Sequence, residues 1–518
     1  MRSIVQTTCL IAAVFACRSA SAEIRRVQWN AMGADNGTSW MNAYPDLQMA
    51  LADADPLDEI WIAAGTYKPG TLPGDTFSIP NLVEVYGGFQ GTNHPTLPNG
   101  ETQRSERDFV NNVTILSGDL GSNDTAEFEN YGDNSQTLVT FAPGSDEDTV
   151  IDGLTICGAN GTAIVAHLNV LAQLRNLVVR DNLSIGGSGA GLSITNDSSP
   201  VIQFSRFTHN KAQAGAAILI SSGCFPEVAD CTFDDNAVEA PAPPLQVDGA
   251  SGGGAVLVNS FQSPNQSPTS FRRCTFTGNS ADHCDGGAIH KKGDLWLLQC
   301  SFYQNVAYGG GVRGGNGGAF FGVNAPLRMY NCDFESNQAL VPWPPGENQP
   351  AGGGAWWNSK DFDANVSNCR FFDNETTGAG KGGAICAYLN MHRASNVTVV
   401  GNRAPQFAGM FVQNADTTEG ISVDYANSIF WGNTSTDTVP PPIADAQVFF
   451  KPGNYTITDT VVHSCVQDDQ IDANHFPGNC NIDDDPEFVD QGGGNLRLMR
   501  ISPCIDTGGI PHPKWTRG

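Results

Sequence analysis

The residues most able to do chemistry are a histidine followed by two lysines and a pair of adjacent aspartates. His290 precedes Lys291 and Lys292, and the three form a locally basic cluster in the repeated part of the chain. Such a histidine could remove a proton as a general base, although an exposed strand residue without a catalytic role is the simpler interpretation. Asp234 and Asp235 offer paired carboxylates, but they stand where a solvated bend is expected. We therefore assign no catalytic residue from the sequence.

Three consecutive aspartates near the C-terminal end are the candidate metal ligands. Carboxylate oxygens are the ligands that Ca²⁺ prefers, and Asp483, Asp484 and Asp485 could supply them. Asp119 and Asp124 form a second acidic pair. Neither set has the spacing of a calcium-binding loop, so an acidic turn is the alternative for both. The sequence predicts no other cofactor.

Aromatic side chains recur at one position of a glycine-rich motif and could bind a ligand. The residue after Gly-Gly-Ala and one apolar residue is His290, Phe321 or Trp357 in three of the copies. If Trp356 points into a core, alternation along a strand sends Trp357 outward, beside Phe321 of the preceding copy. Two stacked exposed rings would form a platform for sugar rings or for a partner protein. The alternative is that this position faces the core.

These motifs belong to a repeat that runs from about residue 186 to residue 435. Each copy pairs a Gly-Gly-Ala-apolar step with Cys-x-Phe-x-x-Asn. The phenylalanines of the second half-motif include Phe207, Phe233, Phe276, Phe302, Phe334 and Phe371. An asparagine stands three residues after each of them, at Asn210, Asn236, Asn279, Asn305, Asn337 and Asn374. Similarity at a recurring period is the sequence signature of a solenoid.

The residue types of the repeat indicate how its coils stack. Cysteine and phenylalanine two residues apart point to the same side of a strand, so the phenylalanines should form one column inside a tube. Asparagine tolerates a left-handed bend and can both donate and accept hydrogen bonds, so an inward asparagine column can satisfy itself. The glycine pair supplies a second turn, and a third bend closes each coil as a three-sided rung. The sequence thus predicts an all-β fold, a parallel β-helix.

The cysteines fall into two groups. Cys465 and Cys480 lie outside the repeat and are candidate disulfide partners in an oxidising compartment, although sequence alone cannot fix their connectivity. Five others, each two residues before a repeat phenylalanine, are expected to be small apolar core residues: Cys231, Cys274, Cys300, Cys332 and Cys369.

The chain divides into four predicted segments. Residues 1–22 begin with a basic residue, continue with a short apolar run and end in Ala-Ser-Ala, as a secretory signal peptide does. Residues 23–60 are expected to form an N-terminal cap and residues 61–435 the β-helix. Residues 436–518, where the repeat fades, are expected to form a C-terminal cap.

A short helix is predicted in the N-terminal cap. Leu47, Ala50 and Leu51 recur at helical spacing, together with Ala43 and Ala54, and would give the helix one buried face. Pro45 could occupy its first turn, where the missing N–H costs little. Such a plug is needed because the first coil of a solenoid would otherwise expose a row of unpaired backbone groups.

The charge of the chain limits its partners. The formal net charge is -27, and removal of residues 1–22, which hold Arg2 and Arg18 but no acid, leaves -29. Such a surface repels nucleic acid and anionic lipid, although the charge could also serve only solubility. No later segment is apolar for long enough to cross a membrane as a helix. We expect a monomer without a nucleic-acid partner.

The paired half-motifs resemble the repeats of polymorphic outer-membrane proteins, which form a right-handed parallel β-helix of the pectin-lyase-like superfamily. The full pair stands at 286–305, 317–337 and 353–374. Asp-Pro-Glu-Phe-Val-Asp at 485–490 and Ser-Pro-Cys-Ile-Asp at 502–506 resemble the ends of large secreted bacterial β-helix proteins. The resemblance implies an extracellular or cell-surface location, including association with a bacterial outer membrane, and a role in adhesion.

A non-catalytic binding or adhesin-like role is therefore the function that the sequence favours. The main alternative is an extracellular polysaccharide lyase or glycoside hydrolase, because many β-helices cleave acidic polysaccharides. The Asn-Thr-Asp, Gly-His-Gly and Arg-Ile-Lys signatures of the hydrolases and the Arg-x-Pro-x-x-Arg segment of the lyases are absent. A passive structural spacer is the third hypothesis.

Overall fold

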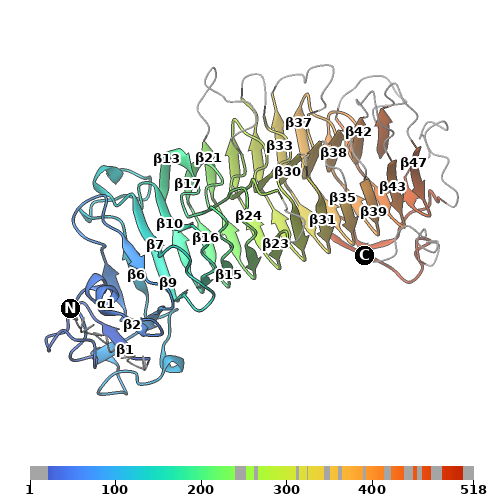
Figure 1. Ribbon diagram of the computed structural model, residues 1–518. Coiled ribbons are helices and arrows are strands. Elements are labelled where there is room, and N and C mark those ends of the chain that lie inside the picture. The colour runs from blue at the N-terminus through green and yellow to red at the C-terminus, as the bar shows by residue number, and fades with distance from the viewer. Residues whose placement is uncertain are drawn as a thin grey trace, which may run out of the picture.

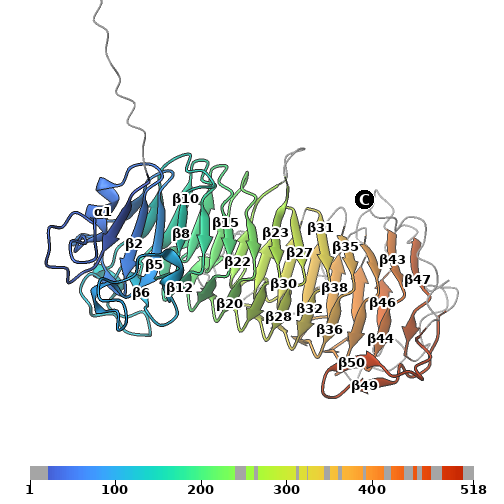
Figure 2. The same cartoon turned by 90° about the horizontal axis from the view of Figure 1, so that it is seen from below.

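The computed structural model describes residues 22–239, 252–261, 267–310, 314–323, 325–342, 351–359, 364–388, 392–413, 422–436, 447–451, 458–467 and 481–505. Within these residues the chain forms an elongated right-handed parallel β-helix, as predicted (Figure 1). Four parallel sheets, here called sheets A to D, run along the rod. A two-stranded antiparallel hairpin lies beside its C-terminal part (Figure 2).

Sheets A and B carry the strands before and after the corner at which each repeat cysteine lies, such as Cys300 between Leu298 and Ser301. Sheet A contains 14 described strands, in the order β1 (Ile24–Val27), β2 (Glu59–Ala63), β5 (Glu84–Phe89), β8 (Val150–Asp152), β11 (Gln173–Arg175), β15 (Val201–Gln203), β19 (Glu227–Ala229), β23 (Thr269–Arg272), β27 (Leu295–Leu298), β31 (Leu327–Tyr330), β35 (Ala364–Ser367), β39 (His392–Ser395), β43 (Ser422–Ala426) and β47 (Thr458–Val462). Sheet B contains 13, in the order β3 (Gly65–Tyr67), β6 (Thr114–Ser117), β9 (Leu154–Cys157), β12 (Val178–Arg180), β16 (Arg206–Thr208), β20 (Thr232–Asp234), β24 (Thr275–Thr277), β28 (Ser301–Tyr303), β32 (Asp333–Glu335), β36 (Arg370–Phe372), β40 (Thr398–Val400), β44 (Ile429–Trp431) and β48 (Cys465–Val466).

Sheets C and D carry the strands on either side of the glycine-rich turns. Sheet C contains 12 described strands, in the order β4 (Phe77–Ile79), β7 (Thr137–Phe141), β10 (Thr162–His167), β14 (Leu192–Thr195), β18 (Ile218–Ile220), β22 (Val256–Val258), β26 (Ile289–Lys291), β30 (Phe320–Val323), β34 (Trp356–Ser359), β38 (Ile385–Tyr388), β42 (Met410–Gln413) and β46 (Val448–Lys451). Sheet D contains nine, in the order β13 (Leu183–Ser188), β17 (Lys211–Ala214), β21 (Ala237–Glu239), β25 (Ser280–Asp282), β29 (Val306–Tyr308), β33 (Gln338–Val341), β37 (Glu375–Gly378), β41 (Arg403–Ala404) and β45 (Thr434–Ser435).

Each regular coil has four strands, whereas the sequence predicted a three-sided rung. The chain passes through β26, β27, β28 and β29, in sheets C, A, B and D, before β30 begins the next coil. The additional strand follows the asparagine corner. Its small inward residues pack in a second core outside the main one, formed by Ala190, Ala212, Ala216, Val238, Ala281 and Cys284.

The glycine pair lies where this second core meets sheet C. Gly286 has φ +73°, a conformation that glycine adopts without the steric cost of a Cβ. A Cβ on Gly287 would lie 2.1 Å from the carbonyl oxygen of Gly318 and 2.6 Å from the nitrogen of Val306, the first residue of the next strand of sheet D. The pair therefore allows a turn and a close approach of neighbouring coils.

The repeat phenylalanines stack inside the tube. Phe276 and Phe302 pair in register on β24 and β28, with ring centroids 4.8 Å apart and planes inclined by 4°. Phe302 and Phe334 repeat this geometry at 4.5 Å and 3°. All of these rings are fully buried in the main core. Parallel strands in register thus convert one repeated residue type into a continuous column.

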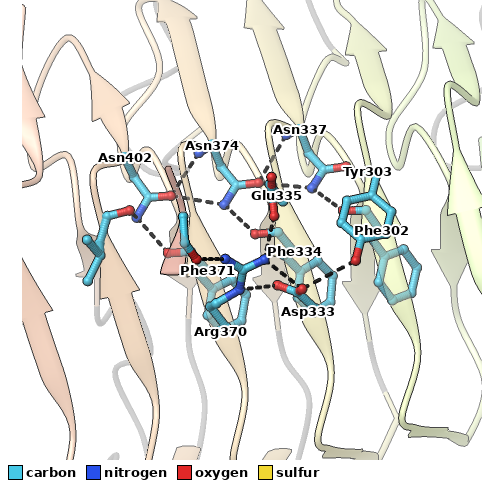
Figure 3. Close-up of polar contacts among 12 residues, drawn as sticks. Phe302, Tyr303, Asp333, Phe334, Glu335, Asn337, Arg370, Phe371, Asn374 and Asn402 are labelled. Atoms are coloured by element: carbon cyan, nitrogen blue, oxygen red, sulfur yellow. Dashed lines mark hydrogen bonds and ion pairs between the residues drawn. The ribbon is translucent and has the colours of Figure 1, made fainter. Parts of the chain in front are cut away.

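The asparagines form a hydrogen-bonded ladder beside the phenylalanine stack. Asn305 Nδ2 donates to Asn337 Oδ1 at 2.9 Å and to the carbonyl oxygen of Phe276 at 2.9 Å. The Asn305 side-chain oxygen accepts from the side-chain and main-chain nitrogens of Asn279 at 2.9 and 3.1 Å. The same pattern links Asn337, Asn374 and Asn402 (Figure 3). Each buried amide is therefore satisfied by the coils on both sides of it.

The β-helix extends past the limits predicted from the repeat, residues 61–435. At the N-terminal end β1 pairs with β2 in sheet A, and after residue 435 the strands β46, β47 and β48 continue sheets C, A and B. The chain passes from β8 in sheet A to β9 in sheet B at Gly153, whose φ of +73° turns it between the two sheets.

Short helices and the hairpin complete the described structure. The N-terminal helix is α1 (Leu47–Asp53), which buries Leu47, Ala50 and Leu51. Its N-cap is Asp46, whose side chain accepts from the Gln48 nitrogen at 2.8 Å, so Pro45 precedes the cap and does not lie in the first turn. The remaining elements are η1 (Gly91–Asn93), η2 (Arg104–Glu106), η3 (Tyr131–Asp133) and the hairpin β49 (Phe488–Asp490) and β50 (Asn495–Leu498).

Two predictions from the sequence concern membranes and export. Residues 1–21, which hold nearly all of the predicted signal peptide, lie outside the described residues. Among the residues that the structure does describe, no helix is long and apolar enough to cross a membrane.

The ladder predicts a large loss of stability for Asn305→Ala. The change removes the partners of the Phe276 carbonyl, the Asn279 amide and the Asn337 side-chain oxygen, all buried, and should lower the free energy of unfolding by roughly 3 kcal/mol or more. Urea unfolding measures this loss. Asn365→Ala, on the outer side of sheet A, is the control and should change stability by less than about 0.5 kcal/mol. Equal effects of the two changes would contradict the role of the ladder.

Candidate functional site

Phe321 and Trp357 stack on the outer side of sheet C. Phe320 and Trp356 point into the main core, so their neighbours Phe321 and Trp357 face the opposite side. The two outward rings pair in register, with centroids 4.6 Å apart and planes inclined by 3°. Each side chain is only 7% exposed. The rings therefore have the expected mutual orientation, but they do not form the exposed platform that we predicted.

Turns that connect sheet D with sheet C cover part of this outer aromatic column. Phe407, in the turn before β42, stacks on Phe411 with ring centroids 5.1 Å apart and on Phe449 at 4.1 Å. The ammonium of Lys381, from the preceding coil, lies 4.7 Å from the ring centroid of Phe411. The rings of this region form one outer hydrophobic cluster with the stacked pair described above. The outer side of sheet C is thus a second packed layer.

His290 is buried at the end of the same column. Its side chain is 1% exposed, and its ring lies 4.7 Å from that of Phe321. Burial lowers the pKa of His290 to about 3, with a further contribution from Lys292, so the imidazole is neutral at ordinary pH. The prediction of an exposed strand residue is wrong. A neutral and enclosed imidazole also has no route to a polymer substrate as a general base.

The lysines beside His290 do not form a surface cluster. Lys291 points to the opposite side of the strand, is fully buried, and donates from Nζ to the carbonyl oxygen of Ala325 at 2.5 Å. Burial lowers the pKa of Lys292. Asp285 lies in the turn before β26, and burial raises its pKa to about 6. Its Oδ1 accepts hydrogen bonds from the main-chain and side-chain nitrogens of Asn316, both at 2.9 Å. These polar groups are structural parts of the covered layer.

The candidate calcium ligands are exposed. Asp483, Asp484 and Asp485 follow β48, and Asp485 Oδ1 accepts from the Glu487 nitrogen at 2.8 Å. Within the described ranges no group of three or more His, Cys, Asp or Glu side chains is arranged to hold a metal ion. Calcium binding at these aspartates therefore stays a prediction.

The second acidic pair lies in the loop region after β6. Burial raises the pKa of Asp124 to about 6, against the effect of the Asn134 amide, which donates to Asp124 Oδ2 at 2.7 Å. The charge of nearby Asp119 adds to the increase. Asp119 itself accepts from the main-chain nitrogens of Asn123 and Asp124 at 3.1 and 3.3 Å, which is the bonding of an acidic turn.

Of the two candidate disulfide partners, the structure describes one, Cys465. Cys480 lies outside the described residues. Cys465 is buried on β48 and is a free thiol in this structure. The pairing of Cys465 with Cys480 therefore stays a prediction.

An exposed tryptophan lies on sheet A, where the sequence analysis placed no binding residue. On β27 the side chains of Leu295 and Leu297 enter the main core, and Trp296 between them is 43% exposed. Register places Trp296 beside Ser270 of β23 and Arg328 of β31. The alternation Leu-Trp-Leu was the signal that could have identified it, because a strand residue between two core residues faces outward. We call the outward side of β23, β27, β31, β35 and β39 the Trp296 face.

The Trp296 face carries arginines although the protein is acidic. Its outward positions hold Arg272, Arg328 and Arg393. The bordering strands β19 and β43 place Glu227 beside Ser270 and Asp424 beside Arg393. Arg272 pairs with Glu227 of the neighbouring strand β19 at 3.0 Å. Tyr330 lies on the same face as Arg328, two residues along β31, and is half-buried. An exposed indole with a guanidinium group on the next strand can stack on a flat ligand and hydrogen-bond to its acidic oxygens.

A second outward cluster, on sheet B, attaches the C-terminal hairpin. Arg370 forms two hydrogen bonds with the carboxylate of Asp333, both at 2.7 Å, and also pairs with Glu335 (Figure 3). Its remaining nitrogen donates to the carbonyl oxygen of Gly494, between β49 and β50, at 2.9 Å. The hydroxyl of Tyr303 donates to Asp333 at 3.4 Å. Because the hairpin and the two acids occupy the guanidinium, this cluster is a structural clamp.

Comparison with known proteins identifies the repeat in one short segment. A family model described as the Chlamydia polymorphic membrane protein repeat matches residues 273–292. No curated protein matches the chain. Among solved structures, the pectate lyase Pel9A shares 12% identity over 95% of this chain and 92% of its own, with a TM-score of 0.34. A rhamnogalacturonan lyase shares 11% identity over 93% and 96% of the two chains, with a TM-score of 0.27.

The matched segment corresponds to a defined part of one coil. It runs from Arg273 through the asparagine corner at Asn279 and the strand β25 to the glycine turn and β26. It therefore contains the elements that form the ladder, the second core and the covered side of sheet C. The chain is thus a right-handed parallel β-helix with a repeat of the polymorphic membrane protein type.

His290→Leu should make stability less dependent on pH, and leucine already occupies the equivalent position of the preceding coil at Leu257. Between pH 6.5 and about 3 the unfolded state binds a proton that the folded state excludes, so wild-type stability falls as pH falls through this range. At pH 5 the wild type should lose about 2 kcal/mol more than the variant, relative to pH 7.5. Urea unfolding at both pH values measures the difference.

The raised pKa of Asp285 changes stability in the opposite direction, because protonation of Asp285 below pH 6 favours the folded state. This contribution is common to wild type and variant, so the comparison isolates His290. If the free energy of unfolding changed with pH equally in the two proteins, the burial of a neutral imidazole would be contradicted.

Arg370→Met should release the hairpin β49–β50 without unfolding the coils. The change removes the hydrogen bond to Gly494. It also removes ion pairs, but these are partly exposed to solvent and contribute little to global stability. Hydrogen exchange of the amides of 488–490 and 495–498 should become several-fold faster. Arg403→Met removes a comparable surface pair with Asp373 and should leave hairpin exchange unchanged. Unchanged exchange in the Arg370 variant would show that other contacts hold the hairpin.

Proposed function

We propose that this chain is a secreted or cell-surface protein with a non-catalytic, adhesin-like role, and that it binds glycan through the Trp296 face. The observation that carries the proposal is the exposure of Trp296 on a flat parallel sheet that is otherwise densely packed. The outer side of sheet C, by contrast, is covered by turns. An indole ring offers an apolar face and a polar N–H, so an exposed tryptophan on an ordered sheet can contact a sugar ring through both.

The arrangement of the face suits a chain of sugar units. Neighbouring strands are about 4.8 Å apart, so the outward residues of successive coils form an evenly spaced row along the rod. Trp296 would stack on the apolar face of one sugar ring. Arg328 in the next coil and Arg393 two coils further along the same row would donate hydrogen bonds to hydroxyl or carboxylate oxygens. Arg272 of the preceding coil lies beside Leu298, two residues along the strand. These side chains project from strands and not from loops, which favours a preorganised site.

Extracellular or surface placement is part of the same proposal. The predicted signal peptide at 1–22, the acidic net charge and the repeat of the polymorphic membrane protein type support it. A repeated coil that exposes one face along its length is suited to contact an extended ligand at a surface.

A polysaccharide lyase or glycosidase remains the alternative to be tested. The burial of His290 removes the base that the sequence offered for such an activity. The carboxylates nearest to these arginines are Glu227, which pairs with Arg272, and Asp424, which lies beside Arg393 in register, and both stand on strands that border the Trp296 face.

Trp296→Ala should weaken glycan binding about tenfold, equivalent to ~1.4 kcal/mol, without changing the unfolding midpoint by more than a small amount. The measurement is retention of the full chain on a glycan panel that includes neutral and acidic polysaccharides, followed by affinity determination for any retained glycan. Trp29→Ala is the matched control, because Trp29 is 60% exposed but belongs to the N-terminal region.

The same panel should be assayed for new reducing ends and for unsaturated products. Product formation by the wild type would reject the non-catalytic role. Retention that is unaffected by Trp296→Ala would reject the Trp296 face as the site. Retention by a surface protein but by no glycan would move the ligand class to protein, and indifference to both would favour a structural spacer.

A further inference from the structure

The loop between β6 and β7 concentrates negative charge. Residues 119–134 hold five acidic residues and no basic residue. Lys68 contacts this loop from the neighbouring coil, but its ammonium donates to neutral oxygens, the carbonyl of Leu120 at 2.9 Å and the hydroxyl of Ser122 at 2.8 Å. The loop therefore carries an excess of carboxylates close to the body of the β-helix.

Two of these carboxylates and one amide come together at Gly158, in the turn after β9. The Cβ of Asp119 and the Oδ2 of Asp124 lie 3.6 and 3.4 Å from the position that a Cβ would take on Gly158. Asp119 Oδ2 accepts from the main-chain nitrogen of Asp124 at 3.3 Å. Asn134 completes the cluster, because its Nδ2 donates to Asp124 Oδ2 and to the carbonyl oxygen of Gly158, both at 2.7 Å. The two ends of the loop thus meet beside one turn.

Two oxygens of this cluster are buried without a hydrogen-bond donor. Asn134 is fully buried, and its side-chain oxygen accepts no hydrogen bond within the described part of the chain. The Oδ1 atom of Asp124 is enclosed in the same way and also has no donor among the described residues. The two side chains are joined through Asn134 Nδ2, so both oxygens belong to one place in the loop. Because buried polar atoms are nearly always paired, two neighbouring acceptors without donors indicate a positively charged ligand.

We propose that the carboxylates of Asp119 and Asp124 and the side-chain oxygen of Asn134 hold one calcium ion. All three groups are oxygen ligands, and Ca²⁺ binds about six to eight of them in a flexible geometry that water can complete. Mg²⁺ requires a near-ideal octahedron and gives up its waters reluctantly, so this irregular set suits it less. The site differs from the exposed aspartates 483–485 because it includes a fully buried amide oxygen.

Calcium at this place would fasten the loop to the β-helix. The loop already packs on the two following coils, since the Tyr131 hydroxyl donates to the carbonyl oxygen of Asp181 at 2.8 Å and the rings of Phe128 and His209 stack with centroids 4.8 Å apart. The ion would link the start of the loop to its end and offset the repulsion between its carboxylates. Its binding should therefore slow the opening of the loop and leave the coils unchanged.

Calcium titration of the full chain tests the proposal. The protein is treated with EDTA, returned to a buffer of about 0.15 M ionic strength so that diffuse attraction to the acidic surface is screened, and titrated with CaCl₂ by calorimetry. We expect a site with a Kd below about 1 mM, and binding of Mg²⁺ that is at least about tenfold weaker. Calcium should also slow hydrogen exchange of the amides of 119–134 several-fold.

Variants of the loop assign the site. Asp124→Asn should weaken this binding at least about tenfold and remove the effect of calcium on exchange over 119–134. Asp119→Asn should act in the same direction, so the test does not depend on one variant. Glu127→Gln is the matched control, because it removes the same charge from an exposed position of the loop and should leave the affinity within about twofold. Urea unfolding without calcium checks that all three variants are folded.

The outcomes separate this site from the others. Calcium bound by residues 483–485 would persist in Asp124→Asn and would not slow exchange over 119–134. Exchange over 119–134 that does not respond to calcium in the wild type, or that responds equally in Asp124→Asn, would overturn the proposal. Equal affinities for Mg²⁺ and Ca²⁺ would overturn the choice of calcium. The site shares no residue with the Trp296 face, so its failure would leave the glycan-binding proposal unaffected.

Discussion

In-register hydrogen bonding between successive parallel coils is the constraint on which this molecule depends. Once β24 pairs with β28 and β28 with β32, every side chain has the same position of the neighbouring coil above and below it. A residue that fits once must then fit beside its own kind. Flat rings stack, and amides that can donate and accept form a ladder. Residues that cannot satisfy this condition are confined to the outward positions.

The same constraint explains why the two broad faces of the rod differ. Sheet A continues into sheet B through a short corner, and Trp296 on its outer side is 43% exposed. Sheet C is entered from sheet D through longer turns, and residues of those turns, such as Phe407, pack on its outward rings. An aromatic residue on sheet C is therefore enclosed, as Trp357 is, while Trp296 on sheet A is open. Topology, more than residue type, decides which aromatic side chain can meet a ligand.

The sequence predicted the β-helix but not which of its outward aromatic side chains are exposed. The offset between phenylalanine and asparagine predicted the parallel β-helix, because it reflects a local geometry that every coil repeats. The strand of sheet D left little signal, since it has four residues or fewer in every described coil after β13, and its inward positions are small, as at Ala281, Ala307 and Ala339. Without that strand, the cover over Trp357 and His290 could not be foreseen. Alternation correctly sent Trp357 outward, but burial depends on turns from other coils, which no local pattern records.

The asparagine ladder has a direction, and this gives the rod two chemically different ends. Every side-chain amide donates toward the C-terminal neighbour, from Asn182 to Asn433. At the N-terminal end of the ladder, the side-chain oxygen of Asn182 needs a donor, and the backbone N–H of Ala159 provides it. At the last end a donor remains, and Gln447 supplies the oxygen for Asn433 at 2.6 Å. Duplication or deletion of a whole internal coil would preserve this polarity, whereas exchanging the two terminal arrangements would leave unmatched groups. Evolution can therefore change the length of such a molecule from its middle more readily than from its ends.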